Sequence, residues 1–114
     1  MKSAGPRRFE NLVAGHLLKW VHHQQDTRGR DLDLRYFRDT EGREVDFVVT
    51  ERDRPILAVE AKWADAEIDR GLRYLKARRP GVDAWQLSAT GRKDFVSPDG
   101  IRVSPAGVFL STLV

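Results

Sequence analysis

The sequence predicts an α/β fold, with an α-β-β-β-α-β core in which helices flank a mixed central sheet. Two observations predict it: segments with helical spacing of apolar residues stand on either side of three strand-like segments, and strand-like segments follow again. Such an order is typical of a sheet with helices packed on its faces. With 114 residues the chain has room for one core, so we expect residues 1–114 to form a single domain.

The first helix is predicted over residues 7–25, because Pro6 stands just before it and Gly29 follows its end. Its apolar stripe recurs at three- and four-residue spacing and comprises Phe9, Leu12, Val13, His16, Leu17 and Trp20. Because His16 lies on this stripe, we expect it to be a packed core residue rather than a metal ligand.

The remaining elements follow from alternation, β-branched content and turn residues. Strands are predicted at residues 32–39, 43–50, 56–63, 83–89 and 101–104, with turns at Glu41-Gly42, 51–55 and Ser97-Pro98-Asp99-Gly100. A second helix is predicted over residues 65–79, with Ile68, Leu72 and Leu75 on one face and Pro80-Gly81 ending it. The tail, 105–114, is expected to be a short helix or a strand. Its apolar part, or the 101–104 strand, is a candidate interface for a homodimer.

Composition excludes several classes of protein. The chain has no cysteine, so disulfides, thiol nucleophiles and cysteine-based metal sites are excluded, and a cytoplasmic location is the default expectation. No apolar run approaches the ~18 residues of a membrane span, so we expect no membrane association. No glycine-rich phosphate loop is present, which excludes a self-contained NTPase.

Charge is unevenly distributed along the chain. The net charge is +3, and a middle segment of net −3 (31–62) lies between segments of net +4 (1–30) and +2 (63–114). This pattern fits ordinary surface variation, or a carboxylate centre with basic arms that hold a polyanion.

The predicted hairpin of residues 43–50 and 56–63 carries the most informative geometry. If its loop centres on Asp53, Asp46 faces Glu60 and Glu44 faces Lys62. The opposite face is then apolar throughout: Val45, Phe47, Val49, Leu57, Val59, Ala61 and Trp63. Two opposed carboxylates repel each other, and a divalent cation between them would convert the repulsion into ligation. Mg²⁺, or Mn²⁺ in its place, is the natural candidate, with Lys62 beside it to orient an attacking water.

The same residues also allow a purely structural interpretation. Lys62 would then form a cross-strand ion pair with Glu44, while Asp46 and Glu60 would point into solvent. Glu10, expected in the first turn of its helix, would interact with the helix dipole.

Three further residues are candidates for substrate contact. Gln86 alternates with apolar neighbours along its strand, so it shares the carboxylate face or is a plain polar strand residue. Arg73 and Tyr74 lie on the second helix, where they contact substrate or belong to a solvated face.

A resemblance to a known superfamily rests on two strand motifs. The segments Glu44-Val45-Asp46-Phe47 and Val59-Glu60-Ala61-Lys62 resemble the core of the PD-(D/E)XK nucleases, although Val45 stands where that motif has proline. Over residues 7–114, the chain is similar to the nuclease-like C-terminal domain of many prokaryotic AAA-type ATP-binding proteins. The runs that carry this similarity are Phe9-Glu10-Asn11-Leu12-Val13, Arg35-Tyr36-Phe37-Arg38, Gly42-Arg43-Glu44-Val45-Asp46-Phe47 and Gly71-Leu72-Arg73-Tyr74.

The resemblance implies a restriction-endonuclease-like fold and a residue-by-residue site. Asp46 and Glu60 match the metal-binding carboxylates, and Lys62 matches the catalytic lysine. The resemblance further implies that the backbone carbonyl of Ala61 is a metal ligand and that Glu10 is the acidic residue a helix adds to the site.

Two functions of different classes remain open at this stage. One is a Mg²⁺-dependent deoxyribonuclease that uses Asp46, Glu60 and Lys62 to hydrolyse phosphodiesters of DNA. The other is a catalytically silent nuclease-like module that binds nucleic acid or an AAA-type ATPase partner.

Overall fold

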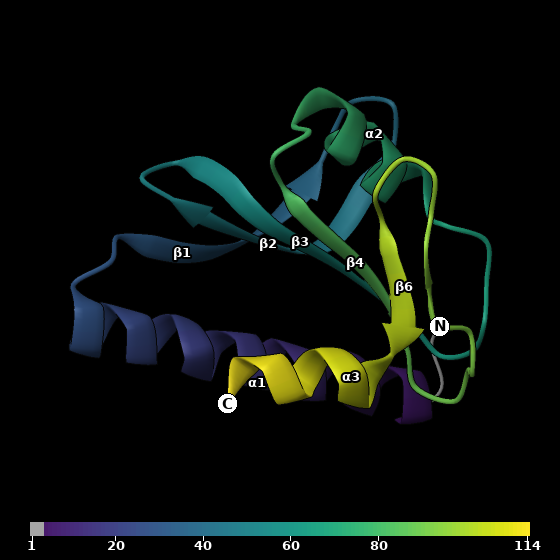
Figure 1. Cartoon of the computed structure of the whole chain (residues 1–114), viewed down its shortest axis with the longest axis horizontal. Helices are drawn as coiled ribbons and strands as arrows, with labels where there is room; N and C mark the ends of the chain where they lie inside the picture. The colour runs from purple at the N-terminus through teal and green to yellow at the C-terminus, as the bar shows by residue number, and fades with distance from the viewer. Residues whose placement is uncertain (1–3) are drawn as a thin grey trace.

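The computed structural model describes residues 4–114, and its sheet is mixed (Figure 1). The elements are α1 (Ala4–Arg28), β1 (Leu32–Arg38), β2 (Glu44–Glu51), β3 (Arg54–Lys62), α2 (Arg70–Arg78), β4 (Asp83–Ser88), β5 (Phe95–Val96), β6 (Arg102–Pro105), α3 (Ala106–Leu110) and a 3₁₀ helix (Ser111–Leu113). The strand order is β1-β2-β3-β4-β6-β5. Pairing is parallel for β3–β4 and β4–β6 and antiparallel elsewhere. The α/β prediction and the α-β-β-β-α-β order are therefore confirmed.

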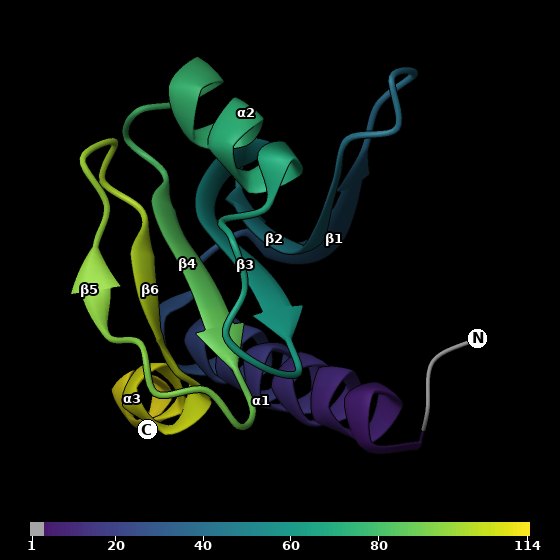
Figure 2. The same cartoon turned by 90° about the vertical axis from the view of Figure 1, so that its right-hand side faces the viewer.

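Two apolar cores lie on opposite faces of this sheet. One packs α1 and α3 against the sheet and includes Leu17, Val59 and Phe109. The other packs α2 against the opposite face through Leu72 and Leu75. Figures 1 and 2 show this layering, with α1 and α3 on one side and α2 on the other.

Helix α1 is longer than predicted and presents a narrower apolar face. Its buried residues recur every fourth position and are Phe9, Val13, Leu17 and Val21. The prediction that His16 is a core residue is wrong, because His16 is exposed, as is Leu12. The helix ends at Gly29, whose φ of 63° lets its N–H bond Gln25 O at 3.0 Å in a left-handed cap.

Helix α2 is shorter than the predicted 65–79, because residues 65–69 form a loop. Asp69 is its N-cap, with a side chain that accepts from the N–H of Gly71. The side chain of Gln86 binds the preceding backbone, accepting from Asp69 N at 2.8 Å and donating to Glu67 O at 3.0 Å. These bonds satisfy backbone N–H and C=O groups of the loop that would otherwise pair within a helix.

The tail, predicted as a short helix or a strand, is helical: it forms α3 and the 3₁₀ helix. The short strand β5 was not predicted, and it pairs with β6 after the expected Ser97–Gly100 turn, closed by a 2.9 Å bond from Gly100 N to Ser97 O. Because β5 pairs with β6, the strand predicted at residues 101–104 is not an open edge of the sheet on which a second copy could pair. Phe109 of the apolar tail is buried against Trp85, with ring centres 5.0 Å apart.

The hairpin register centred on Asp53 is confirmed from Phe47–Val59 to Val49–Leu57. It shifts by one residue nearer the turn, so Ile56 packs against the α1 core instead of the polar face. A second irregularity sets Asp46 and Phe47 opposite the single residue Tyr36 of β1. Because a bulge turns the strand, Val45 packs in the α2 core, and the prediction that it shares the apolar face of Phe47 and Val49 is wrong.

The β2–β3 turn is a strained position for its sequence. Arg52 and Asp53 have φ values of 50° and 66°, as in the hairpin turn type that favours asparagine followed by glycine. We expect Arg52→Asn to raise the free energy of unfolding by about 0.5–1 kcal/mol, because arginine adopts this region at a cost. Urea unfolding of the two proteins measures the difference. An equal or lower stability of the variant would contradict this account of the turn.

Candidate active site

The site begins where strands β2 and β3 separate. The backbone pairing between them ends at Phe47–Val59, and carboxylates take the place of the next pair. Glu60 Oε1 accepts from the Asp46 N–H at 2.9 Å, and Asp46 Oδ2 accepts from the Ala61 N–H at 3.0 Å. The two acidic side chains are thereby oriented by each other's strand. The interpretation in which both point into solvent is wrong for Glu60, which is 7% exposed.

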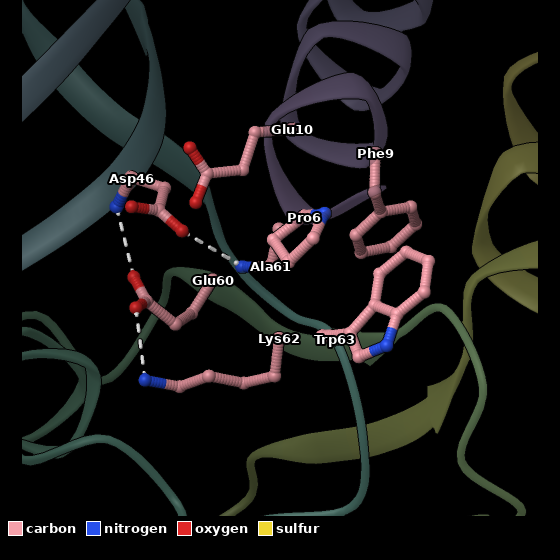
Figure 3. A pocket seen from close by; sticks show the side chains of 8 residues that line it. All are labelled: Pro6, Phe9, Glu10, Asp46, Glu60, Ala61, Lys62 and Trp63. Atoms are coloured by element: carbon pink, nitrogen blue, oxygen red, sulfur yellow. Dashed lines mark hydrogen bonds and ion pairs between the residues drawn. The ribbon is translucent and has the colours of Figure 1, made fainter. Parts of the chain in front are cut away.

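A pocket of about 250 Å³ opens beside these carboxylates (Figure 3). Glu10 extends from α1 toward this pocket and lines it together with Asp46. The structure thus brings Glu10 together with the four predicted site residues of the two strand motifs, which are Asp46, Glu60, Ala61 and Lys62. The complete lining is Pro6, Phe9, Glu10, Asp46, Glu60, Ala61, Lys62 and Trp63.

Glu10 does not lie where its structural interpretation requires. Because α1 begins at Ala4, Glu10 falls in the second turn, and the first turn contains no acidic residue. The prediction that it interacts with the helix dipole as a first-turn carboxylate is therefore wrong.

Burial of Glu60 dominates the electrostatics of the pocket. Burial, together with the negative charges of Asp46 and Asp69, raises the pKa of Glu60 from 4.5 to about 7. The backbone hydrogen bond from Asp46 and the charge of Lys62 oppose these effects. The ionised form of this buried carboxyl group would therefore be stabilised by a cation bound beside it.

Lys62 contacts acidic groups on both sides. Its Nζ lies 3.3 Å from Glu60 Oε2 and 3.1 Å from Asp69 Oδ1. Burial disfavours its ammonium, but the hydrogen bond to Asp69 and the charge of Glu60 outweigh it, so the pKa of Lys62 is raised. The predicted ion pair with Glu44 is wrong, since Glu44 lies 3.3 Å from Arg38.

Asp69 is a site residue that the sequence analysis missed. Its Oδ2 caps α2 and its Oδ1 accepts from Lys62, while its own N–H donates to Gln86. A signal was present, because aspartate directly before an amphipathic segment is typical of a helix N-cap. That its carboxylate also reaches Lys62 depends on the loop of residues 63–69, which the predicted helix concealed.

Gln86 lies beside Glu60 in the parallel pairing of β3 and β4, as its alternation predicted. It is 2% exposed, and its amide is bonded to the loop before α2 rather than directed into the pocket. Gln86 therefore helps to hold the backbone of Asp69 in place.

Arg73 and Tyr74 are not among the residues that line the pocket. Arg73 donates to Asp99 at 2.8 Å. Tyr74 packs against Phe37, and the guanidinium of Arg43 lies 3.6 Å from its ring centre. Arg73 thus reaches toward the 97–100 turn, and Tyr74 reaches toward β1.

The donor set suits a hard divalent cation. Asp46 and Glu60 supply carboxylate oxygens, the ligands that Mg²⁺ prefers, and Mg²⁺ commonly binds through one or two carboxylates and keeps several waters. Among residues 4–114, no three acidic or histidine side chains are grouped closely enough to hold a metal. A cation here would thus be held by Asp46 and Glu60, and the backbone carbonyl of Ala61 stays a predicted further ligand.

The fold and site define a class: an α/β protein whose mixed sheet carries an acid-and-lysine pocket where two strands separate. The family described as "Domain of unknown function (DUF4143)" matches residues 7–108, so the chain belongs to this family. Neither the curated proteins nor the solved structures give a match. In the part of the chain that the structure describes, no helix combines the length and apolarity that crossing a membrane requires.

Proposed function

We propose that this protein hydrolyses phosphodiester bonds of DNA with a divalent metal ion, using a site of the PD-(D/E)XK type. One observation carries the proposal: Asp46, Glu60 and Lys62 line a single pocket, with Glu10 from α1. Each of the two carboxylates is oriented by a backbone N–H. The pocket volume of about 250 Å³ is below the ~300–1,000 Å³ typical of pockets that enclose drug-sized ligands, so the pocket suits one phosphate group better than such a ligand.

The residues divide the reaction between them. When bound, Mg²⁺ supplies positive charge that polarises the phosphate and acidifies a water. Asp46 and Glu60 would hold the cation, and the Glu60 carboxyl would have to be deprotonated to do so. The Lys62 ammonium, already held beside Glu60, orients the attacking water and offsets negative charge that develops on the phosphate.

In this proposal, Asp69 positions Lys62. Asp69→Ser keeps a good helix N-cap but removes the carboxylate that lies 3.1 Å from Lys62 Nζ. We expect kcat for DNA cleavage to fall about tenfold to a hundredfold, with KM and melting temperature nearly unchanged. Asp69→Asn, which keeps an acceptor oxygen, should retain more activity than the serine variant. Equal kcat in all three proteins would remove Asp69 from the mechanism.

The direct test is cleavage of duplex, single-stranded and branched DNA in Mg²⁺ or Mn²⁺, with EDTA as the control. Metal-dependent cleavage that EDTA abolishes would support the proposal. Thermal unfolding in the same buffers reports metal binding independently of cleavage, because a ligand that binds the folded state raises the melting temperature. The absence of both DNA cleavage and metal-dependent thermal stabilisation would contradict the proposal.

The second candidate is a silent module that binds nucleic acid or an AAA-type ATPase partner. One finding favours it: within residues 4–114 no group of three potential ligands surrounds a metal position. This candidate predicts DNA or partner binding that is equal in Mg²⁺ and EDTA. Metal-dependent cleavage by the wild-type chain would refute it.

A further inference from the structure

The pocket has two chemically different walls. Glu10, Asp46, Glu60 and Lys62 form a charged wall, and Pro6, Phe9 and Trp63 form an apolar, aromatic one (Figure 3). The charged wall suits a phosphate and its metal ion. The mechanism proposed above makes no use of the aromatic wall.

Trp63 is the exposed member of that wall. It follows Lys62 directly, is 45% exposed, and lies outside both apolar cores. Phe9, by contrast, is buried. A large aromatic side chain left half-exposed beside a reactive pocket has an area available for a ligand.

The position of the Trp63 ring is well determined by its surroundings. Its benzene edge rests on the start of α1, where a β-carbon at position 5 would come within 2.9 Å of Trp63 Cη2, so only the glycine at Gly5 leaves room for it. The backbone carbonyl of Trp63 accepts two hydrogen bonds from Thr90, from its N–H and from its Oγ1, each at 2.8 Å, and these bonds fix the main chain from which the ring projects. Because the ring also rests against α1, it loses little further freedom when a ligand binds.

We infer that Trp63 is a stacking platform for an unpaired nucleobase next to the scissile phosphate, so that the preferred substrate is single-stranded DNA. This inference rests on the proposed function. Aromatic side chains stack on bases of any sequence, because every base has a π-face. In a duplex the base faces are already covered, and exposing one requires flipping it out at a cost of a few kcal/mol. The aromatic wall therefore contributes binding energy only to an unpaired strand or end.

The test compares binding of labelled single-stranded and duplex oligonucleotides of equal length in Mg²⁺, in a Lys62→Met background in which cleavage is expected to be at least about 10²- to 10³-fold slower. We expect Trp63→Leu, which keeps apolar bulk without a ring, to weaken single-strand binding roughly 5- to 100-fold. Duplex binding should change less than about twofold, and Trp63→Phe should retain most of the single-strand affinity. The matched control is Phe95→Ala, which removes a similarly exposed aromatic residue from β5, outside the pocket.

The outcomes separate this inference from the proposed function. Equal loss of affinity for both DNA forms in Trp63→Leu, or no loss for either, overturns the stacking role while leaving metal-dependent cleavage by the wild-type chain intact. Loss of affinity in Phe95→Ala as large as in Trp63→Leu also overturns it. Absence of DNA cleavage and DNA binding in the wild-type chain would refute the proposed function, and this inference with it.

Discussion

Replacement of Lys62 by methionine is expected to lower kcat for DNA cleavage by at least about 10²- to 10³-fold. The side chain keeps its approximate length but loses the ammonium that lies 3.3 Å from Glu60 and 3.1 Å from Asp69. Removing one preorganised donor to developing charge typically has an effect of this size. Single-turnover cleavage in saturating Mg²⁺ measures it without interference from product release.

Two control variants test whether the loss of cleavage is specific to the charge of Lys62 in the pocket. Lys19→Met removes an exposed lysine of α1 that lies outside the pocket, and should cleave as the wild type does. Lys62→Arg keeps the charge with a different geometry and should recover part of the activity. Cleavage by Lys62→Met at the wild-type rate would assign any observed nuclease activity to another site.

The metal-free protein should become more stable at pH 8 when Glu60 is replaced by glutamine. The folded state raises the pKa of Glu60 from 4.5 to about 7. A raised carboxyl pKa means that the protonated group favours folding: this contribution is complete below pH 4.5 and is lost as the pH rises to about 7. The difference of roughly 2.5 pH units corresponds to about 3 kcal/mol, of which Glu60→Gln avoids the greater part.

The measurement is urea unfolding in EDTA at pH 4.5 and pH 8. We expect the variant and wild type to differ little at pH 4.5, and the variant to exceed the wild type by up to about 3 kcal/mol at pH 8. Saturating Mg²⁺ should reverse the order, because only the wild type keeps both carboxylates and ligand binding stabilises the folded state. Glu44→Gln, an exposed change on β2, is the matched control. A pH-independent difference between Glu60→Gln and wild type would contradict the burial of an ionisable carboxyl at this position.

Sequence patterns were most reliable where neighbours in the chain decide the structure. Turn residues and hydrophobic periodicity placed both long helices and five of the six strands, and the register of the β2–β3 hairpin followed from its alternation. The opposition of Asp46 and Glu60 was predictable for the same reason, since pairing of adjacent strands is a local geometric property.

Other features depended on contacts between distant segments. The bulge that turns Val45 to the α2 face is set against Tyr36 of β1, and His16 is exposed because the sheet covers only a narrow stripe of α1. The loop at residues 65–69 resists helix formation because Gln86, seventeen positions beyond Asp69, binds its backbone. No pattern within a short window contains such information.

The fold class, the order of the main elements and the two strand motifs that carry Asp46, Glu60 and Lys62 can be predicted from the amino-acid sequence. Packing in three dimensions adds that Glu10 joins them from α1, that Asp69 holds Lys62, and that Trp63 and Phe9 form a second wall. Periodicity is sufficient for the first group because it fixes which face of an element a residue occupies. The contacts on that face are set by how helices and loops far apart in the chain pack against the sheet.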